Sequence, residues 1–337
     1  MPDPAISVIL PVWNVAGHVG AAVDCLLAQT FGRFEAIVVD DGSTDGSGEI
    51  ARVASGADPR FRFLRQTHAG LSAARNAGLT RARAPLIAFL DGDDAYAPAF
   101  LATLHAALEA TGAPLAACAV DLAFPDRTSA VAAMHGRRHP ACDGPWAEMR
   151  LDDWREIVRH WPSAWNKLYR RDLLEGLTFP SGLAYEDHPF FHAVAERADR
   201  LVYVPEPLYR HTRGRTGQIT ADASDRVFDQ FAILDRCAAI LRASAKPGAV
   251  EGLARIATRV VHERAQVLRA APRRRRFLAR ARTVFAAESL SWTCGWDADI
   301  SRATGVALAG RPALSVVIAT DGAGEGPPAC ASAASRH

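Results

Sequence analysis

Short apolar runs alternate with amphipathic stretches along the first part of the chain. The apolar runs contain many β-branched residues, as buried strands do, and cover residues 6–12, 34–40, 60–66 and 85–90. Stretches with helical spacing separate them, at residues 19–29, 47–54 and 70–82. The last of these carries small residues on one side, which allow close packing on a sheet. The alternation predicts right-handed βαβ units and a parallel sheet.

The pattern changes after the fourth apolar run. Helical spacing is predicted at residues 98–112, 163–176 and 185–198, with a short helical piece near 152–160, and strands are predicted at 114–124 and 200–211. Residues 125–162 are otherwise loop-rich, and loops of this length in a compact domain usually carry function. Residues 221–309 read as mostly helical and rich in Arg and Ala. The run PALSVVIATDGAGEG then resembles the first strand, and we expect disorder from Gly322 onward.

Acidic clusters follow two of the predicted strands. FLDGDD ends the fourth strand with Asp91, Asp93 and Asp94, and VVDDGSTD ends the second. Carboxyl ends of parallel strands meet at one edge of a sheet, where ligands bind. Asp91 and Asp93 can hold Mg²⁺ through oxygen together with phosphate oxygens, and this hypothesis competes with a solvated turn or helix cap. The aspartates of the second cluster suit ribose hydroxyls and base N–H groups, with an Asx-turn as the alternative.

Two further segments carry candidate chemistry. Glu186 and Asp187 are adjacent acids before an amphipathic helix, and their repulsion can leave one of them as a general base, although a helix cap is the alternative. The segment YRHTRGRTG, from Tyr209 to Gly217, places arginines around glycine, which suits a diphosphate as well as it suits a solvated basic turn. His211 in this segment is a candidate metal ligand.

Composition narrows the class of protein. The chain has 337 residues, is 49% hydrophobic and carries a formal net charge of +2, so nothing in the global charge supports nucleic-acid binding. Its six cysteines are widely spaced without a C-x-x-C pair, which fits a reducing compartment. We expect a cytoplasmic protein without a signal peptide. The basic run PRRRR, residues 272–276, is either a solvated face or a peripheral contact with the inner membrane surface.

Six motifs taken together resemble a known family. They are ISVILPVWN, VVDDGSTDGS, THAGLSAARNAGL, FLDGDD, WNKLYRR and YEDHPFF. Their order and spacing between Ala5 and Gly217 are similar to those of the inverting family-2 glycosyltransferases of the bacterial cell-surface polysaccharide and cell-wall glycan type. The resemblance implies an α/β GT-A fold: a Rossmann-like nucleotide-diphospho-sugar transferase with a mixed sheet flanked by helices. Together with the helical pattern and the composition that follow Gly217, it predicts a catalytic domain at 1–220, a helical region at 221–310, and a tail at 311–337 that is disordered or begins a further module.

The resemblance assigns roles to single residues. The donor nucleotide sugar is assigned to Pro11, Val12, Asn14, Asp40, Asp41, Arg75, Asn76, Asp91, Gly92, Asp94, Arg210 and Arg213. Asp91 and Asp93 form the D-x-D pair for Mn²⁺ or Mg²⁺. Asp187 becomes the general base, with Glu186 as neighbour or competitor. Trp165, Asn166 and Lys167 shape the acceptor side.

The implied reaction is metal-dependent transfer, with inversion, from a nucleotide-diphosphate sugar, expected to be a UDP-sugar, to a hydroxyl of a glycan or polyol acceptor at the cell surface. The alternative is a catalytically degenerate module of a larger protein that only binds nucleotide sugar or glycan. The intact acidic pairs, Asp91 with Asp93 and Glu186 with Asp187, favour the enzyme. A further alternative is a nucleotidyltransferase that forms sugar nucleotides. Such an enzyme needs a glycine-rich triphosphate loop with a basic residue near the N-terminus, and no such loop is visible in this sequence.

Overall fold

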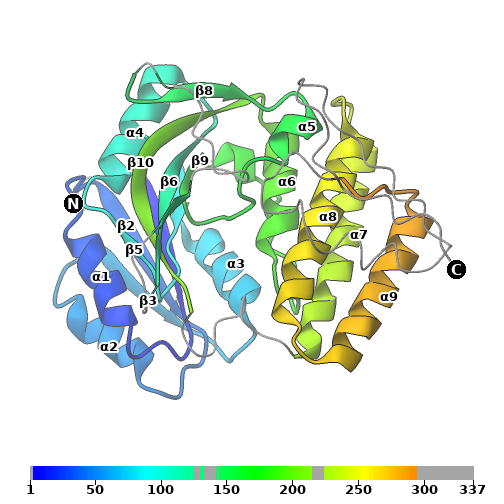
Figure 1. The fold of residues 1–337 in the computed structure, drawn as a ribbon. Coiled ribbons are helices and arrows are strands. Elements are labelled where there is room, and N and C mark those ends of the chain that lie inside the picture. The colour runs from blue at the N-terminus through cyan, green and yellow to red at the C-terminus, as the bar shows by residue number, and fades with distance from the viewer. Residues whose placement is uncertain (1–2, 125–129, 133–141, 143, 215–223, 294–337) are drawn as a thin grey trace, which may run out of the picture.

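A mixed β-sheet forms the centre of the N-terminal part of the protein (Figure 1). The computed structural model describes residues 3–124, 130–132, 142, 144–214 and 224–293. Within them the sheet has ten strands, and its main order is β3-β2-β1-β4-β9-β6-β10-β5, with β7 beside β6 and β8 beside β10. The strands are β1 (Ile6–Val12), β2 (Phe34–Asp40), β3 (Phe61–Arg65), β4 (Leu86–Phe89), β5 (Ala95–Tyr96), β6 (Leu115–Ala123), β7 (Ala130–Ala132), β8 (Ala147–Arg150), β9 (Lys167–Arg170) and β10 (Arg200–Thr212).

The four neighbouring strands β3, β2, β1 and β4 are parallel, as the alternating pattern predicts. Every residue of β1, β2 and β4 is buried, which explains why these strands read as unbroken apolar runs. Val12 pairs with Asp40 at the ends of β1 and β2, and Ile9 pairs with Phe89 at the end of β4. This register brings the residues that follow the three strands to one edge of the sheet.

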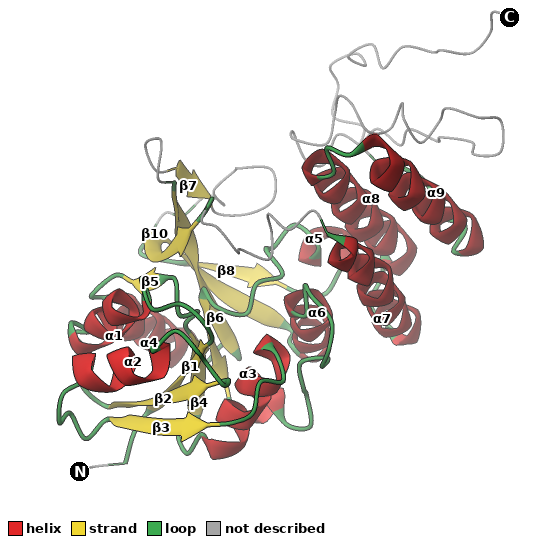
Figure 2. Ribbon diagram, turned by 90° about the horizontal axis from the view of Figure 1, so that it is seen from below, coloured by secondary structure: helices red, strands yellow, loops and turns green. Residues whose placement is uncertain are grey.

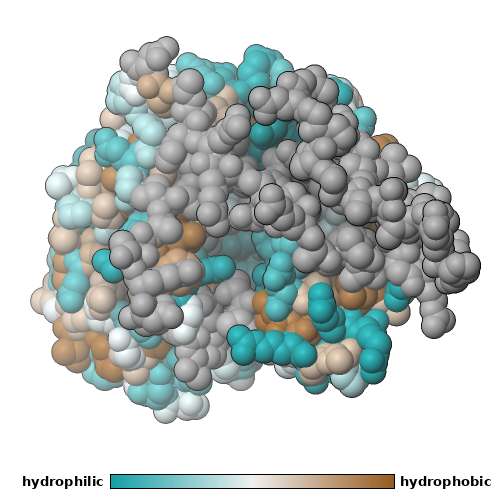
Figure 3. Space-filling model, in the orientation of Figure 1, coloured by the Kyte–Doolittle hydropathy of each residue, from teal (hydrophilic) through white to brown (hydrophobic). Residues whose placement is uncertain are grey.

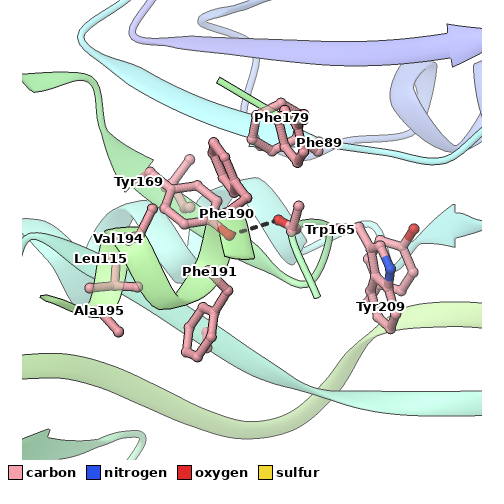
Figure 4. Close-up of a cluster of buried hydrophobic side chains, with 14 of the residues drawn as sticks. Phe89, Leu115, Trp165, Tyr169, Phe179, Phe190, Phe191, Val194, Ala195 and Tyr209 are labelled. Carbon is pink, nitrogen blue, oxygen red and sulfur yellow. Dashed lines mark hydrogen bonds between the residues drawn. The ribbon is translucent and has the colours of Figure 1, made fainter. Parts of the chain in front are cut away.

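Helices cover both faces of the sheet, as Figure 2 shows. One face carries α1 (Val19–Leu27), α2 (Ser47–Ala54) and α4 (Phe100–Thr111), and the other carries α3 (Leu71–Arg81) and α6 (Asp187–Arg197). A cluster of aromatic side chains fills the space between the second face and α6 (Figure 4). In it Phe179 stacks on Phe190 with ring centroids 3.8 Å apart, and Phe89 meets both rings edge-on. This core holds α6 and the turn before it against β4.

The C-terminal part of the described chain is helical, as predicted. Its helices are α7 (Asp229–Ala243), α8 (Ala249–Val267) and α9 (Ala271–Ala287), and the short α5 (Trp154–Ile157) packs on α8. Among the described residues no helix combines the length and the apolar character needed to cross a membrane. Where Figure 3 colours the surface, polar and apolar side chains are interspersed. The predicted strand-like run and tail after Gly310 lie outside the described residues.

One predicted element is wrong. The helical spacing of residues 163–176 predicts a helix, whereas the structure has strand β9 followed by a 3-10 turn at Asp172–Leu174. β9 runs antiparallel to β4 on one side and to β6 on the other. Both of its edges are therefore hydrogen-bonded inside the sheet, and this pairing outweighs a local pattern that fits a helix equally well. Together with β5, β7 and β8, which also pair antiparallel to a neighbour, β9 makes the sheet mixed.

Close packing of α3 on β1 depends on Gly78. A Cβ at this position would overlap the buried Ile9 side chain, whereas a Cβ at Gly20 of α1 would have its nearest neighbour, Ile50 Cγ2, at 4.0 Å. We expect Gly78→Ala to lower the free energy of unfolding by about 1–3 kcal/mol despite the better helix propensity of alanine. The control Gly20→Ala is expected to raise it by up to ~1 kcal/mol. Urea unfolding measures both, and equal stabilisation by the two changes would contradict the close packing.

Candidate active site

Turns that follow β1, β2 and β4 meet at the edge of the sheet. Asn14, after β1, has a left-handed backbone (φ 49°), and its Oδ1 accepts a hydrogen bond from the backbone N–H of Thr44 at 2.9 Å. The third turn contains Gly92, where a Cβ would lie only 3.0 Å from the carbonyl oxygen of Pro11. Glycine thus lets the turn that carries the D-x-D aspartates approach the end of β1, where Val12 is buried.

Arg75 of α3 connects the D-x-D turn to the acidic pair before α6. Its Nη2 lies 2.6 Å from Asp91 Oδ1, and its Nη1 lies 2.5 Å from Glu186 Oε1 and 2.6 Å from Asp187 Oδ1. The Arg75 side chain is only 1% exposed, and its guanidinium carbon lies 5.1 Å from the centre of the Phe179 ring. One cation therefore contacts three carboxylates. Two of them, Glu186 and Asp187, lie more than a hundred residues from Arg75 in the sequence. We call Arg75, Asp91, Glu186 and Asp187 the arginine–carboxylate cluster.

Electrostatics distinguishes the members of this cluster. Burial and the neighbouring Asp187 carboxylate raise the pKa of Glu186 to about 7, although Arg75 opposes the shift. Burial likewise raises the pKa of Asp91 to about 6, against the opposing charge of Arg75. Burial alone lowers the pKa of Arg75, but the three carboxylates hold this pKa well above its usual value. The cluster retains excess negative charge when all three acids are ionised.

Asp94 is fixed by strand β10. Its carboxylate accepts hydrogen bonds from the Tyr209 hydroxyl at 2.7 Å and from the backbone N–H of Thr212 at 2.8 Å, and His211 Nδ1 lies 3.0 Å away. The Thr212 hydroxyl donates to the carbonyl oxygen of Asp93 at 2.6 Å. Asp94 therefore anchors the D-x-D turn to the strand, while Asp93 is half-buried on the same turn.

The second turn is held by its own aspartates. Asp41 Oδ1 accepts hydrogen bonds from Gln66 Nε2 at 2.7 Å and from the backbone N–H of Ala69 at 2.9 Å, and Oδ2 accepts from that of Gly70 at 2.8 Å. Asp40 accepts from the backbone N–H of Ser43 at 2.8 Å. Both carboxylates are buried and shape the loops around the edge of the sheet.

Three predicted donor-site residues face different surroundings. Arg210 lies on the opposite side of β10 from His211, with its side chain 63% exposed and Nε 3.8 Å from Asp121. Arg213 is partly buried near Asp94, and burial lowers the pKa of its guanidinium. Asn76 exchanges two hydrogen bonds of 2.9 Å with the backbone of Phe179. The structure therefore brings Arg213 to the edge of the sheet, whereas Asn76 braces the aromatic core.

The predicted acceptor-side residues lie mainly in the interior. Lys167 Nζ donates to the carbonyl oxygens of Ser163 at 2.7 Å and Trp161 at 2.9 Å, and burial lowers its pKa to about 7. Asn166 donates to the carbonyl oxygen of Cys118 at 2.7 Å. Trp165 stacks on Tyr209, with ring centroids 4.4 Å apart, as Figure 4 shows. These side chains fix the loop before β9.

The D-x-D turn has the donor set expected for a hard divalent cation. Within the described residues no group of three or more His, Cys, Asp or Glu side chains is arranged to hold a metal ion. Mg²⁺ typically takes only one or two protein carboxylates together with phosphate oxygens and water, so Asp91 and Asp93 fit that need. Both ring nitrogens of His211 have protein partners: Nδ1 lies 3.0 Å from the Asp94 carboxylate, and Nε2 lies 3.4 Å from Arg213 Nη1, so neither nitrogen is left open for a metal ion.

Sequence reasoning missed two features of the site. Tyr209 and Thr212 hold the D-x-D turn, and the alternation of Tyr209 with His211 in a predicted strand places both side chains on one face. Trp13 stacks on His68, with ring centroids 4.3 Å apart, and Trp13 is 48% exposed. An exposed tryptophan directly after a buried strand could have indicated this aromatic platform.

The mixed sheet, with helices on both faces and acidic turns after its parallel strands, has a fold of the GT-A type. S. aureus TarS 1–349 in complex with UDP-GlcNAc superposes with a TM-score of 0.64 at 21% identity, covering 82% of this chain and 80% of that one. Mannosyltransferase PcManGT from Pyrobaculum calidifontis, in complex with GDP-Man and Mn²⁺, superposes with a TM-score of 0.55 at 19% identity. This superposition covers 85% of this chain and 80% of that one.

Sequence comparison identifies the family. Residues 7–178 match the model of glycosyl transferase family 2, and the chain belongs to that family. It is 34% identical to the uncharacterized glycosyltransferase EpsJ of Bacillus subtilis over 61% of this chain and 60% of EpsJ. It is 31% identical to glycosyltransferase GlyA of Streptococcus pneumoniae over 65% of this chain and 32% of GlyA. It is 32% identical to the putative glycosyltransferase EpsH of Bacillus subtilis over 73% of this chain and 72% of EpsH. The first two alignments span less than two thirds of the relatives' lengths.

Proposed function

We propose that the protein is a metal-dependent, inverting glycosyltransferase. It moves a sugar from a nucleotide-diphosphate sugar, which we expect to be a UDP-sugar, to a hydroxyl of a glycan or polyol acceptor of the cell surface. The family, the relatives named as glycosyltransferases, and the UDP-GlcNAc and GDP-Man complexes of similar folds support this proposal. In this proposal residues 1–220 form the catalytic domain and residues 221–310 form a helical region.

The arginine–carboxylate cluster is the observation that carries the proposal. Arg75 holds the first aspartate of the D-x-D pair and the candidate base Asp187 within 2.6 Å of one guanidinium. A transferase needs its donor diphosphate and its base at a fixed separation, because the acceptor oxygen must attack opposite the leaving group. A module that only binds sugar would not need a buried cation shared between the two sites.

The residues divide the chemistry between them. Asp187, whose side chain is 17% exposed, takes the proton of the acceptor hydroxyl as its oxygen attacks the anomeric carbon, whereas Glu186 is 6% exposed. Asp91 and Asp93 would hold the Mn²⁺ or Mg²⁺, and this ion would neutralise the charge of the leaving diphosphate when bound. Arg213 adds positive charge at the same edge. A direct displacement of this kind inverts the anomeric centre.

The donor nucleotide is proposed to lie over the first two turns. The exposed Trp13–His68 stack offers a face for the base, and Asn14 and the loop anchored by Asp41 border the same region. Trp165 and the loop before β9 are proposed to shape the acceptor side. We further propose a cytoplasmic location, with α9 in peripheral contact with the anionic inner face of the membrane through its arginines.

A thermal-shift screen of nucleotide sugars with and without Mn²⁺ tests the donor assignment. Ligands that bind only the folded state raise the melting temperature by mass action. We expect a shift with one nucleotide sugar, larger with Mn²⁺ and reduced in Asp93→Ala. An equal shift in Asp93→Ala would refute the metal assignment, and no shift with any nucleotide sugar would favour the degenerate module.

The pH dependence of transfer follows from the Glu186–Asp187 pair. Because the pKa of Glu186 is raised to about 7, the Glu186–Asp187 pair takes up one proton as the pH falls through this value, and a proton shared by the pair is no longer absent from the candidate base. We expect kcat/KM to fall about tenfold per pH unit below pH 7. In Glu186→Gln this decline should move to lower pH, and an unchanged profile in that variant would contradict the assignment.

A further inference from the structure

Tyr185, directly before the acidic pair, has an unusual backbone. Its φ is +68°, in the left-handed region that residues other than glycine rarely adopt, and Glu186 and Asp187 follow it at the start of α6. A residue in this conformation persists only where its surroundings fix it. The direction in which α6 begins, and with it the position of the Asp187 carboxylate, depends on the conformation of this one residue.

Helix α8 of the helical region supplies the contacts that fix Tyr185. Arg264 Nη1 donates a hydrogen bond to the Tyr185 hydroxyl at 3.0 Å, and its guanidinium carbon lies 4.9 Å from the centre of the tyrosine ring. Arg264 is 7% exposed, and Glu263 lies 3.5 Å from it. A buried, charge-compensated arginine that contacts both the ring and the hydroxyl restrains the side chain in two directions.

A second contact comes from helix α7. The carboxylate of Asp229, at the start of α7, accepts a hydrogen bond from the backbone N–H of Ala184 at 3.1 Å. From the other side, the arginine–carboxylate cluster holds Asp187, whose Oδ2 also accepts from the backbone N–H of Ala164 at 3.3 Å. The turn at residues 184–187 is therefore clamped between the helical region and the sheet.

We propose that Arg264 is a positioning residue: through Tyr185 it holds the Glu186–Asp187 turn at the geometry that proton removal from the acceptor requires. The proposal rests on the proposed transferase function. It gives the helical region a part in catalysis although Arg264 itself touches no reacting atom. Small displacements of a base lower the rate of the chemical step without changing how the donor binds.

Three variants test it: Tyr185→Phe, which removes only the hydroxyl, Arg264→Met, and the double change. We expect kcat to fall about 3- to 10-fold in Tyr185→Phe and about 10- to 100-fold in Arg264→Met, with the KM of the donor and the Kd of the nucleoside diphosphate unchanged. The double variant should be no worse than Arg264→Met, because both changes break one interaction. Arg264→Lys should recover part of the loss.

The control is Arg242→Met, which removes an arginine of α7 that is paired with Glu288 and is 58% exposed. Its kcat should equal that of the unchanged protein. Unchanged kcat in both Tyr185→Phe and Arg264→Met would overturn the proposal. So would a Kd for the nucleoside diphosphate that weakens in step with kcat, since Arg264 would then be a donor ligand.

Amide hydrogen exchange separates this proposal from the proposed function. Exchange of the amides of residues 184–188 should be faster in Arg264→Met than in Arg242→Met, whether or not a donor has been identified. A protein without transferase activity but with this faster exchange would refute the function and keep the positioning contact. Unchanged exchange at residues 184–188 would refute the positioning contact itself.

Discussion

Asp187→Asn is expected to lower kcat for sugar transfer by about 10²–10⁴-fold at saturating donor and Mn²⁺, because a carboxamide of the same shape cannot take the acceptor proton. Its oxygen can still accept a hydrogen bond from Arg75, so the position of the turn should be preserved. The Kd of the nucleoside diphosphate should change little. Steady-state kinetics and calorimetric titration measure the two quantities separately.

Glu186→Gln is the matched comparison, because Glu186 contacts the same nitrogen of Arg75. This variant should retain much more activity than Asp187→Asn at pH 8. The reverse order of the two activities would show that Glu186 is the base. Full turnover in Asp187→Asn would remove Asp187 from the chemical step.

Arg75→Met is expected to lower the free energy of unfolding by about 3–5 kcal/mol near neutral pH, because it leaves buried carboxylates without their cation. The loss should grow with pH. Without Arg75 the folded-state pKa values of Asp91 and Glu186, which burial already raises to about 6 and 7, rise further. Carboxyl groups with a raised folded-state pKa favour the folded state only while protonated, so stability falls as the pH rises through those values. Urea unfolding at pH 5.5 and pH 8 measures the difference.

Arg83→Met provides the control for Arg75→Met. Arg83 also pairs with a buried carboxylate, Glu35 at 2.9 Å, but its side chain is 62% exposed. Glu35 keeps Ser7 and Arg62 as partners when Arg83 is removed. We expect a loss of about 1 kcal/mol or less with little dependence on pH. Equal losses in the two variants would contradict the central place of Arg75 in the fold.

The strand-end acids show what could be predicted from the sequence. Unbroken apolar runs at β1, β2 and β4 predict buried parallel strands, and the acidic turns that follow them must then share one edge. The positive charge that Asp91 requires could not be assigned in this way. Arg75 lies in a different motif, and its approach to Asp91 depends on how α3 packs on the sheet.

Other parts of the site depend on non-local contacts that a sequence pattern does not contain. The helical spacing of residues 163–176 gave no sign that β9 would enter the sheet between β4 and β6. Lys167 and Asn166 are polar residues that a pattern places at a surface, whereas buried backbone carbonyls accept their hydrogen bonds. Asp40 accepts from the backbone N–H of Ser43 in a local turn, which the sequence allows, whereas nothing in the acidic pair predicts that Asp41 holds the distant loop at residues 69–70.

The anomeric configuration of the sugar released from its donor tests the central claim most directly. Proton NMR can follow slow hydrolysis of the donor identified by thermal shift, with water as acceptor, in Mn²⁺ and in EDTA. We expect an α-linked donor to release the β-sugar first, only with the metal, and much more slowly in Asp187→Asn. Initial release of the α-sugar, or equal release in EDTA, would contradict a metal-dependent inverting transferase.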